Sequence, residues 1–130
     1  MSGAGQALQN GVFTHLAGNA DLMARFRPNI SGQLPLPYFS FEAMASTRRE
    51  DIAGLDTHRL TFAVWAALQA QADADDLADR LQTQLALPVP VTGYRIVHFT
   101  FAGRSVQTDN ALRLLRVDLD YQILTEKKAG

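Results

Sequence analysis

Two neighbouring carboxylates and a histidine are the residues of this 130-residue chain that come nearest to a catalytic group. Asp118 and Asp120 are two positions apart in a segment that alternates apolar and polar residues, so their side chains project from one strand face, about 7 Å apart. With His98, they could serve acid and base chemistry in a small-molecule site. Arg116 shares their face, and this favours a ladder of ion pairs at a solvated or partner-facing surface.

The remaining motifs argue against an enzyme. A dense acidic cluster consists of Asp73, Asp75, Asp76 and Asp79. It lacks the glycine and closing glutamate of a calcium loop, and carboxylates at a helix start are favoured by its positive end, so we expect helix caps there. No histidine has a second one at metal-ligand spacing, the chain has no cysteine, and no phosphate-binding loop occurs. We therefore predict no catalytic residue, no cofactor and no metal.

Composition places the chain among globular proteins. Residues 1–130 are long enough for one domain with a real core, 47% of them are hydrophobic, and the net charge is −1. A nearly neutral chain is not expected to bind nucleic acid by itself, because such binding usually shows as a basic surplus. No apolar run is long enough to span a membrane. We expect residues 1–5 and 125–130 to be flexible.

Helical spacing predicts two elements at the start of the chain. In residues 6–17, Leu8, Val12 and Leu16 stand four apart and form one apolar stripe of a helix, which Gly11 weakens. A second short helix is predicted over residues 20–26, with Asn19 as its cap.

The stretch 56–87 is the predicted centre of the fold. In residues 56–68 Leu60, Phe62 and Val64 recur every second residue, which is the period of a strand. The opposite face is not polar throughout, and we expect a central strand covered on both sides, with Trp65 in the core. Residues 73–87 then follow helical spacing and are expected to pack on the sheet.

Three more strands complete the predicted sheet. They are residues 38–45, 94–102 and 115–123, and a polar turn is expected at 103–110. Between the first strand and the central one, a dozen mostly polar residues (46–57) suggest a long hairpin whose tip stands clear of the domain. The predicted class is α+β, with a mainly antiparallel four-stranded sheet, helices on one face and this protruding hairpin.

With the elements in this order, three stretches carry a resemblance to a known family. The first helix ends in Asn19-Ala20-Asp21-Leu22. The first strand is entered through Leu34-Pro35-Leu36-Pro37-Tyr38, and the central strand reads Thr57-His58-Arg59-Leu60-Thr61-Phe62-Ala63-Val64-Trp65. Over residues 8–123 the chain resembles the small tail-completion proteins, or tail terminators, of long-tailed phages and phage-like gene transfer agents.

The resemblance implies a structural protein of a virion or virus-like particle, assembled in the bacterial cytoplasm. Its copies would form a homohexameric ring that caps the head-proximal end of the tail, stops polymerisation of the major tail tube protein and meets a head-side connector or stopper protein. DNA would pass through the lumen only as cargo. A head-completion position next to it is the structural alternative, and a small-molecule-binding α+β domain is the other.

A ring needs two different contact surfaces on each subunit. The hairpin tip and the polar face of the last strand could supply them, although a solvated loop is an equally common role for such a tip. The residues expected at these contacts are Arg48, Arg49, Glu50, Asp51, Arg116, Asp118 and Asp120.

Overall fold

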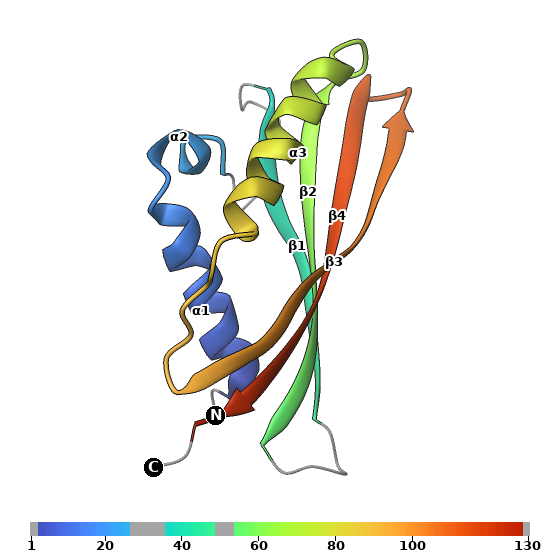
Figure 1. Cartoon of the computed structure of the whole chain (residues 1–130). Coiled ribbons are helices and arrows are strands. Elements are labelled where there is room, and N and C mark those ends of the chain that lie inside the picture. Colours follow the sequence, from blue (N-terminus) through green and yellow to red (C-terminus); the bar gives the residue numbers. More distant parts are fainter. Residues whose placement is uncertain (1–2, 27–35, 49–53, 129–130) are drawn as a thin grey trace.

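Four antiparallel strands form the sheet on which the described helices pack. The computed structural model describes residues 3–26, 36–48 and 54–128. The strands are β1 (Tyr38–Arg48), β2 (Leu55–Ala67), β3 (Tyr94–Asp109) and β4 (Leu114–Lys127). Their order across the sheet is β1-β2-β4-β3, and every neighbouring pair is antiparallel (Figure 1). The α+β class and the four-stranded antiparallel sheet predicted from the sequence are confirmed.

Three helices lie together on one face of this sheet (Figure 1). They are α1 (Ala4–Ala17), α2 (Ala20–Met23) and α3 (Gln71–Leu85). The predicted stripe of α1 is buried, because residues four apart lie on one side of a helix. Asn19 caps α2 as expected, its side chain accepting a hydrogen bond from the Leu22 amide at 3.1 Å.

The acidic start of α3 differs from its prediction. The helix begins at Gln71, two residues earlier than expected, and no side chain caps it. Its carboxylates serve other contacts. Arg104 on β3 donates to Asp75 at 2.9 Å and to Asp79 at 2.8 Å, while Asp76 pairs with Arg80 one turn along the helix.

The core lies between the helices and the sheet. It is built from alternate residues of the two central strands, which are Leu60, Phe62, Val64 and Ala66 of β2 and Leu115, Val117, Leu119, Tyr121 and Ile123 of β4. Each fully buried large apolar side chain contributes roughly 1.5–3 kcal/mol relative to an exposed one. The period-two pattern of the last strand therefore predicted its buried face correctly.

The other face of the sheet corrects two predictions. We expected a layer on both sides of β2, but all described helices lie on one side (Figure 1). Ala63 is still fully buried on the helix-free face, and Trp65 beside it is only partly buried. Trp65 is therefore not part of the core. Side chains of neighbouring strands cover this face in place of a second layer.

The β1–β2 hairpin is confirmed, but its strands are longer than predicted. The ladder continues through Ser46, Thr47 and Arg48, which pair with His58, Thr57 and Asp56. Residues 46–48 and 55–57 thus belong to strands, because backbone pairing and a buried His58 hold this part of the hairpin together.

β3 also extends beyond its predicted end. The segment 103–110 was expected to be a turn, yet Gly103–Asp109 pairs with Asp120–Leu114 of β4. The error arose because most of these residues are polar and exposed, which is typical of an edge strand as well as of a turn. Register shifts between Ile96 and His98 and between Phe101 and Gly103 also interrupt the strict alternation.

Secondary structure extends closer to both ends of the chain than the sequence predicted. α1 already includes Ala4, which is buried, and β4 continues to Lys127. Thr125 is fully buried and its hydroxyl lies 2.8 Å from Nε2 of His58. The flexibility of residues 1–5 and 125–130 stays a prediction, and the structure shows that residues 4 and 5 belong to α1 and residues 125–127 to β4.

Candidate interaction surface

The helix-free face of the sheet carries the polar row that the sequence singled out. Arg116, Asp118 and Asp120 are alternate residues of β4, and the buried residues between them face the helices. The alternation therefore placed all three on one face, as predicted. Asp118 is only 8% exposed, so its carboxylate contacts neighbouring side chains of the sheet rather than projecting into solvent.

Arg116 is the centre of a hydrogen-bonded network on this face. Its Nε lies 2.6 Å from Oδ1 of Asp118, and its Nη1 lies 3.4 Å from Oε1 of Glu42 on β1. Its guanidinium carbon is 5.1 Å from the ring centre of Trp65, the geometry of a cation–π contact. One arginine thus joins three strands, and its charge is balanced by two carboxylates.

Three further contacts extend the network to both edges of the sheet. The Trp65 Nε1–H donates to the Ser40 hydroxyl at 3.2 Å, and that hydroxyl donates to Oε2 of Glu42 at 2.6 Å. At the other edge, Nε2 of Gln107 donates to Oδ2 of Asp118 at 3.0 Å. All four strands are connected, so these side chains are held in fixed positions.

Four members of this network were missed from the sequence, Ser40, Glu42, Trp65 and Gln107. Trp65 was assigned to the core, and Gln107 fell in a segment predicted as a turn. Glu42 is the only carboxylate in β1, at a register shift between Phe41 and Ala43. A single charge within an otherwise uncharged stretch, residues 38–47, was the one signal that could have drawn attention to it.

The same geometry excludes the predicted acid–base alternative. Asp120 accepts a hydrogen bond from Thr61 at 2.7 Å, and both oxygens of Asp118 are engaged by Arg116 and Gln107. His98 pairs with Leu124, which is six residues from Asp118 and therefore about 20 Å away along the strand. The structure does not bring His98 and these carboxylates into one site.

A second polar group lies in the core near the base of the β1–β2 hairpin. His58 is 1% exposed, its Nδ1 lies 2.7 Å from the Ser46 hydroxyl, and its Nε2 lies 2.8 Å from that of Thr125. The three side chains connect β1, β2 and β4. Burial lowers the pKa of His58 below its usual 6.5, while the charge of Asp56 acts in the opposite direction.

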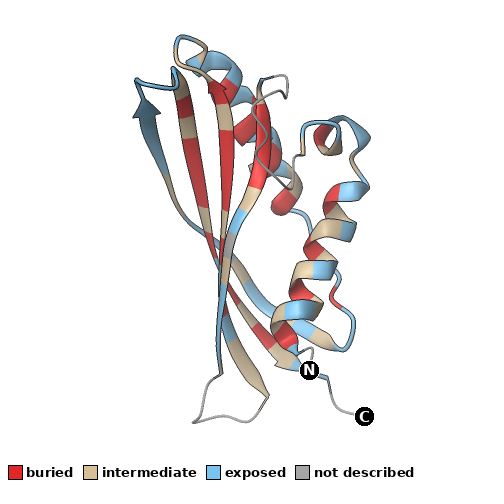
Figure 2. Ribbon diagram, turned by 180° about the vertical axis from the view of Figure 1, so that it is seen from behind, coloured by how far each residue is buried: buried red, intermediate tan, exposed pale blue. Residues whose placement is uncertain are grey.

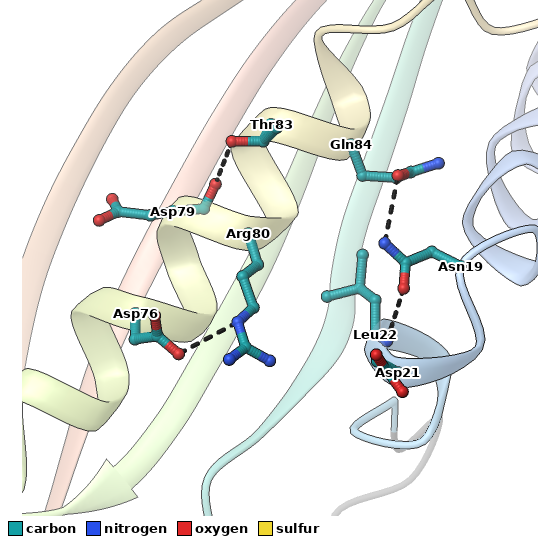
Figure 3. A pocket seen from close by; sticks show the side chains of 8 residues that line it. All are labelled: Asn19, Asp21, Leu22, Asp76, Asp79, Arg80, Thr83 and Gln84. Atoms are coloured by element: carbon teal, nitrogen blue, oxygen red, sulfur yellow. Dashed lines mark hydrogen bonds and ion pairs between the residues drawn. The ribbon is translucent and has the colours of Figure 1, made fainter.

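A hollow of about 400 Å³ lies between α2 and α3. Figure 3 shows its lining, which is Asn19, Asp21, Leu22, Asp76, Asp79, Arg80, Thr83 and Gln84. Much of its polar lining is used within the fold. The Asn19 amide donates to Gln84 at 3.3 Å, and the Thr83 hydroxyl donates to the Asp79 carbonyl. The hollow is an open gap between two packed helices and not a binding site with convergent free polar groups.

The hairpin residues predicted as contacts are only partly covered by the structure. The backbone of Arg48 ends β1, and Arg49, Glu50 and Asp51 lie outside the described residues. Within the described ranges, no group of three or more histidine, aspartate or glutamate side chains could hold a metal ion. No helix in that part of the chain is long and apolar enough to cross a membrane.

Comparison with known proteins gives one family and two solved structures. The family described as tail completion protein gp17 matches residues 10–126 of the chain. A chain from the virion of a native gene transfer agent particle has 22% identity and a TM-score of 0.79, and the match covers 96% of this chain and 99% of that one. The gp17 protein of bacteriophage SPP1 has 22% identity and a TM-score of 0.65, covering 98% and 94%. No curated protein sequence matches significantly.

Proposed function

Because this chain belongs to the tail completion protein gp17 family, whose members are structural proteins of the virion tail and not enzymes, we propose that it is a tail terminator. Its copies form a closed ring of six on the head-proximal end of the tail tube. The ring stops polymerisation of the major tail tube protein, meets the head-side connector, and leaves a lumen through which DNA passes.

The observation that carries this proposal is the family match over residues 10–126. The described part of the structure is compatible with it in two ways. The sheet has two different edges, β1 and β3, and a closed ring requires two different surfaces on each subunit. The net charge of −1 would allow DNA to slide through a lumen without being held.

We assign the contacts with other proteins to two regions. The first is the hairpin tip with Arg48, Arg49, Glu50 and Asp51. The second is the helix-free face with Arg116, Asp118 and Asp120, where the network around Arg116 holds side chains rigid before any partner arrives. Rigid arginine and tryptophan side chains are typical of the residues that dominate binding energy at interfaces.

Electron microscopy of particles tests the position and the role. Deleting the gene should give tail tubes of irregular length that do not join heads, and a tagged copy should lie at the head-proximal end of the tail in complemented particles. A tag on the head itself would instead indicate the head-completion position. Tails of normal length that join heads in the deletion strain would refute the proposal.

The contact residues are tested with two variants in the same assay. One replaces residues 48–51 by serine and glycine, and the other is Arg116→Ala. Both should reduce the yield of joined particles, and the variant of residues 48–51, at the end of the β1 edge, should also reduce the light-scattering mass of any ring. Arg80→Ala is the matched control, because Arg80 is an exposed arginine on α3, away from both regions. Normal rings and particles from either variant would exclude that region from the interface.

A further inference from the structure

Among the described residues, long stretches of both edges of the sheet have no backbone partner on their outer side. β3 runs for 16 residues, and within the described residues its backbone pairs only with β4. The beginning of β1 is covered, because the Phe39 amide donates to the Arg25 carbonyl at 2.8 Å. From Ala43 to Arg48 its outer edge has no such partner in the described part of the chain. An open strand edge is a template for pairing with another strand.

The two edge strands carry few of the side chains that usually prevent such pairing. β1 and β3 contain no lysine and no proline. β1 contains Glu42 and, at its end, Arg48, and the two arginines of β3 are engaged by carboxylates of α3 and β4. Three large apolar side chains of β3 are exposed instead, Val97 at 42%, Phe101 at 41% and Val106 at 49%. Figure 2 shows exposed residues along much of this strand. Its two register shifts leave His98–Phe101 as a regular stretch between them.

The strand directions identify what fits these edges. Because the sheet has an even number of antiparallel strands, β1 and β3 run in opposite directions. If a second copy of the chain is placed beside the first in the same orientation, its β1 continues the alternation next to β3. The joint would then be antiparallel, which is the more common kind of pairing.

We propose that the β3 edge of one copy pairs with the Ala43–Arg48 part of β1 in the next copy, so that the sheets of neighbouring subunits are continuous. The inference rests on the proposed ring and names the surfaces that close it. Pairing of two β3 edges about a two-fold axis would produce a dimer and leave β1 unused, so it could not build a ring.

The ladder across one sheet predicts which residues meet. Ala45 is opposite Arg59, Arg59 is opposite Gln122, and Gln122 is opposite Thr100. These residues form a single row on the helix-free face. For copies at the same height, Ala45 of one subunit therefore lies beside Thr100 of its neighbour, about 5 Å apart as in any neighbouring pair on one sheet face. Both side chains are exposed.

Cysteine cross-linking in assembled particles tests this pairing directly, because the chain has no cysteine. The variant with Ala45→Cys and Thr100→Cys, treated with a short bifunctional thiol reagent, should give a ladder of multimers. A second pair, Thr47→Cys with Thr100→Cys, detects a pairing shifted by two residues. Each single variant should remain monomeric. The matched control joins Thr100→Cys with Leu87→Cys, an exposed apolar position in the connector after α3 and outside both edge strands.

The outcomes separate this inference from the proposed function. Dimers from Thr100→Cys alone would show β3–β3 pairing and overturn the inference. The absence of multimers from both pairs, in particles whose tails are normal and carry the protein at the head-proximal end, would also overturn it while leaving the tail terminator role intact. A protein located elsewhere in the particle would refute the proposed function itself.

A charge on the edge gives a second readout. Val97→Lys should leave the melting temperature unchanged, because the side chain is already partly in solvent, but should prevent multimer formation. Leu87→Lys makes the same chemical change at 51% exposure and should leave multimers unaffected. Equal multimer yields from the two variants would contradict a β3 interface.

Discussion

Replacing Gly11 by alanine separates two predictions of opposite sign. Gly11 lies in the middle of α1, where alanine is favoured over glycine by about 1 kcal/mol in an isolated helix. On helix propensity alone, the variant should be more stable. In the folded chain, α1 packs closely against the connector between α3 and β3, and the new methyl group would enter this contact.

The size of the clash follows from the geometry. A Cβ atom at position 11 would lie 2.4 Å from the Pro90 carbonyl oxygen and 3.2 Å from Cγ2 of Val91, whereas ordinary contact begins near 3.4 Å. The oxygen belongs to the backbone and cannot rotate away, and Val91 is itself buried in the core. Overpacking of this kind costs about 1–3 kcal/mol, and more where the backbone must move. Because the 2.4 Å contact is with a backbone atom, we take the upper part of this range, about 2–3 kcal/mol. After the gain of about 1 kcal/mol in helix propensity, we expect a net loss of about 1–2 kcal/mol.

Thermal and urea unfolding followed by circular dichroism measure this loss. For a domain of this size, it corresponds to a fall in melting temperature of about 4–7 °C. Thr14→Ala is the control, because Thr14 is exposed on the same helix and should gain about 0.5 kcal/mol from propensity alone. If Gly11→Ala proves more stable than the parent chain, the close approach of α1 to Pro90 is refuted.

Three other measurements follow from the structure. Because burial lowers the pKa of His58, the unfolded chain binds a proton at a higher pH than the folded chain does. The free energy of unfolding should therefore fall as the pH drops below about 6.5, the pKa of an unperturbed histidine. In urea titrations at several pH values, His58→Gln should lose this part of the pH dependence. The Tyr121 hydroxyl is buried with no hydrogen-bond partner among the described residues, and burial raises its pKa to about 12. In the same assay, Tyr121→Phe should therefore be as stable as the parent chain or up to about 1 kcal/mol more stable. A marked loss of stability would indicate that the hydroxyl has a partner. Arg104→Lys keeps the charge but loses the forked pair of hydrogen bonds to Asp75 and Asp79. The backbone amides of Gly103–Asp109 should then exchange hydrogen faster, while the global free energy of unfolding changes by about 1 kcal/mol or less. Unchanged exchange would show that Arg104 does not hold this half of β3.

On the helix-free face, the sequence predicted which residues lie together, and only the structure showed which contacts they make. Alternation along β4 was enough to put Arg116, Asp118 and Asp120 on one face, because successive side chains of a strand point in opposite directions. It could not show that Arg116 lies over Trp65 or reaches Glu42. These contacts depend on which strands are neighbours and on their register, and both are set by long-range pairing.

The boundaries of the helices and strands were also only partly predictable from the sequence. Spacing alone located α1 and the buried face of β4, because an apolar stripe must be buried wherever it occurs. The outer half of β3 has no such stripe, and it is a strand because β4 offers it a ladder and Arg104 ties it to α3. Local pattern thus determined the elements that bury apolar surface. Tertiary pairing decided the polar edge strand and the network on the open face, since those depend on partners far away in the sequence.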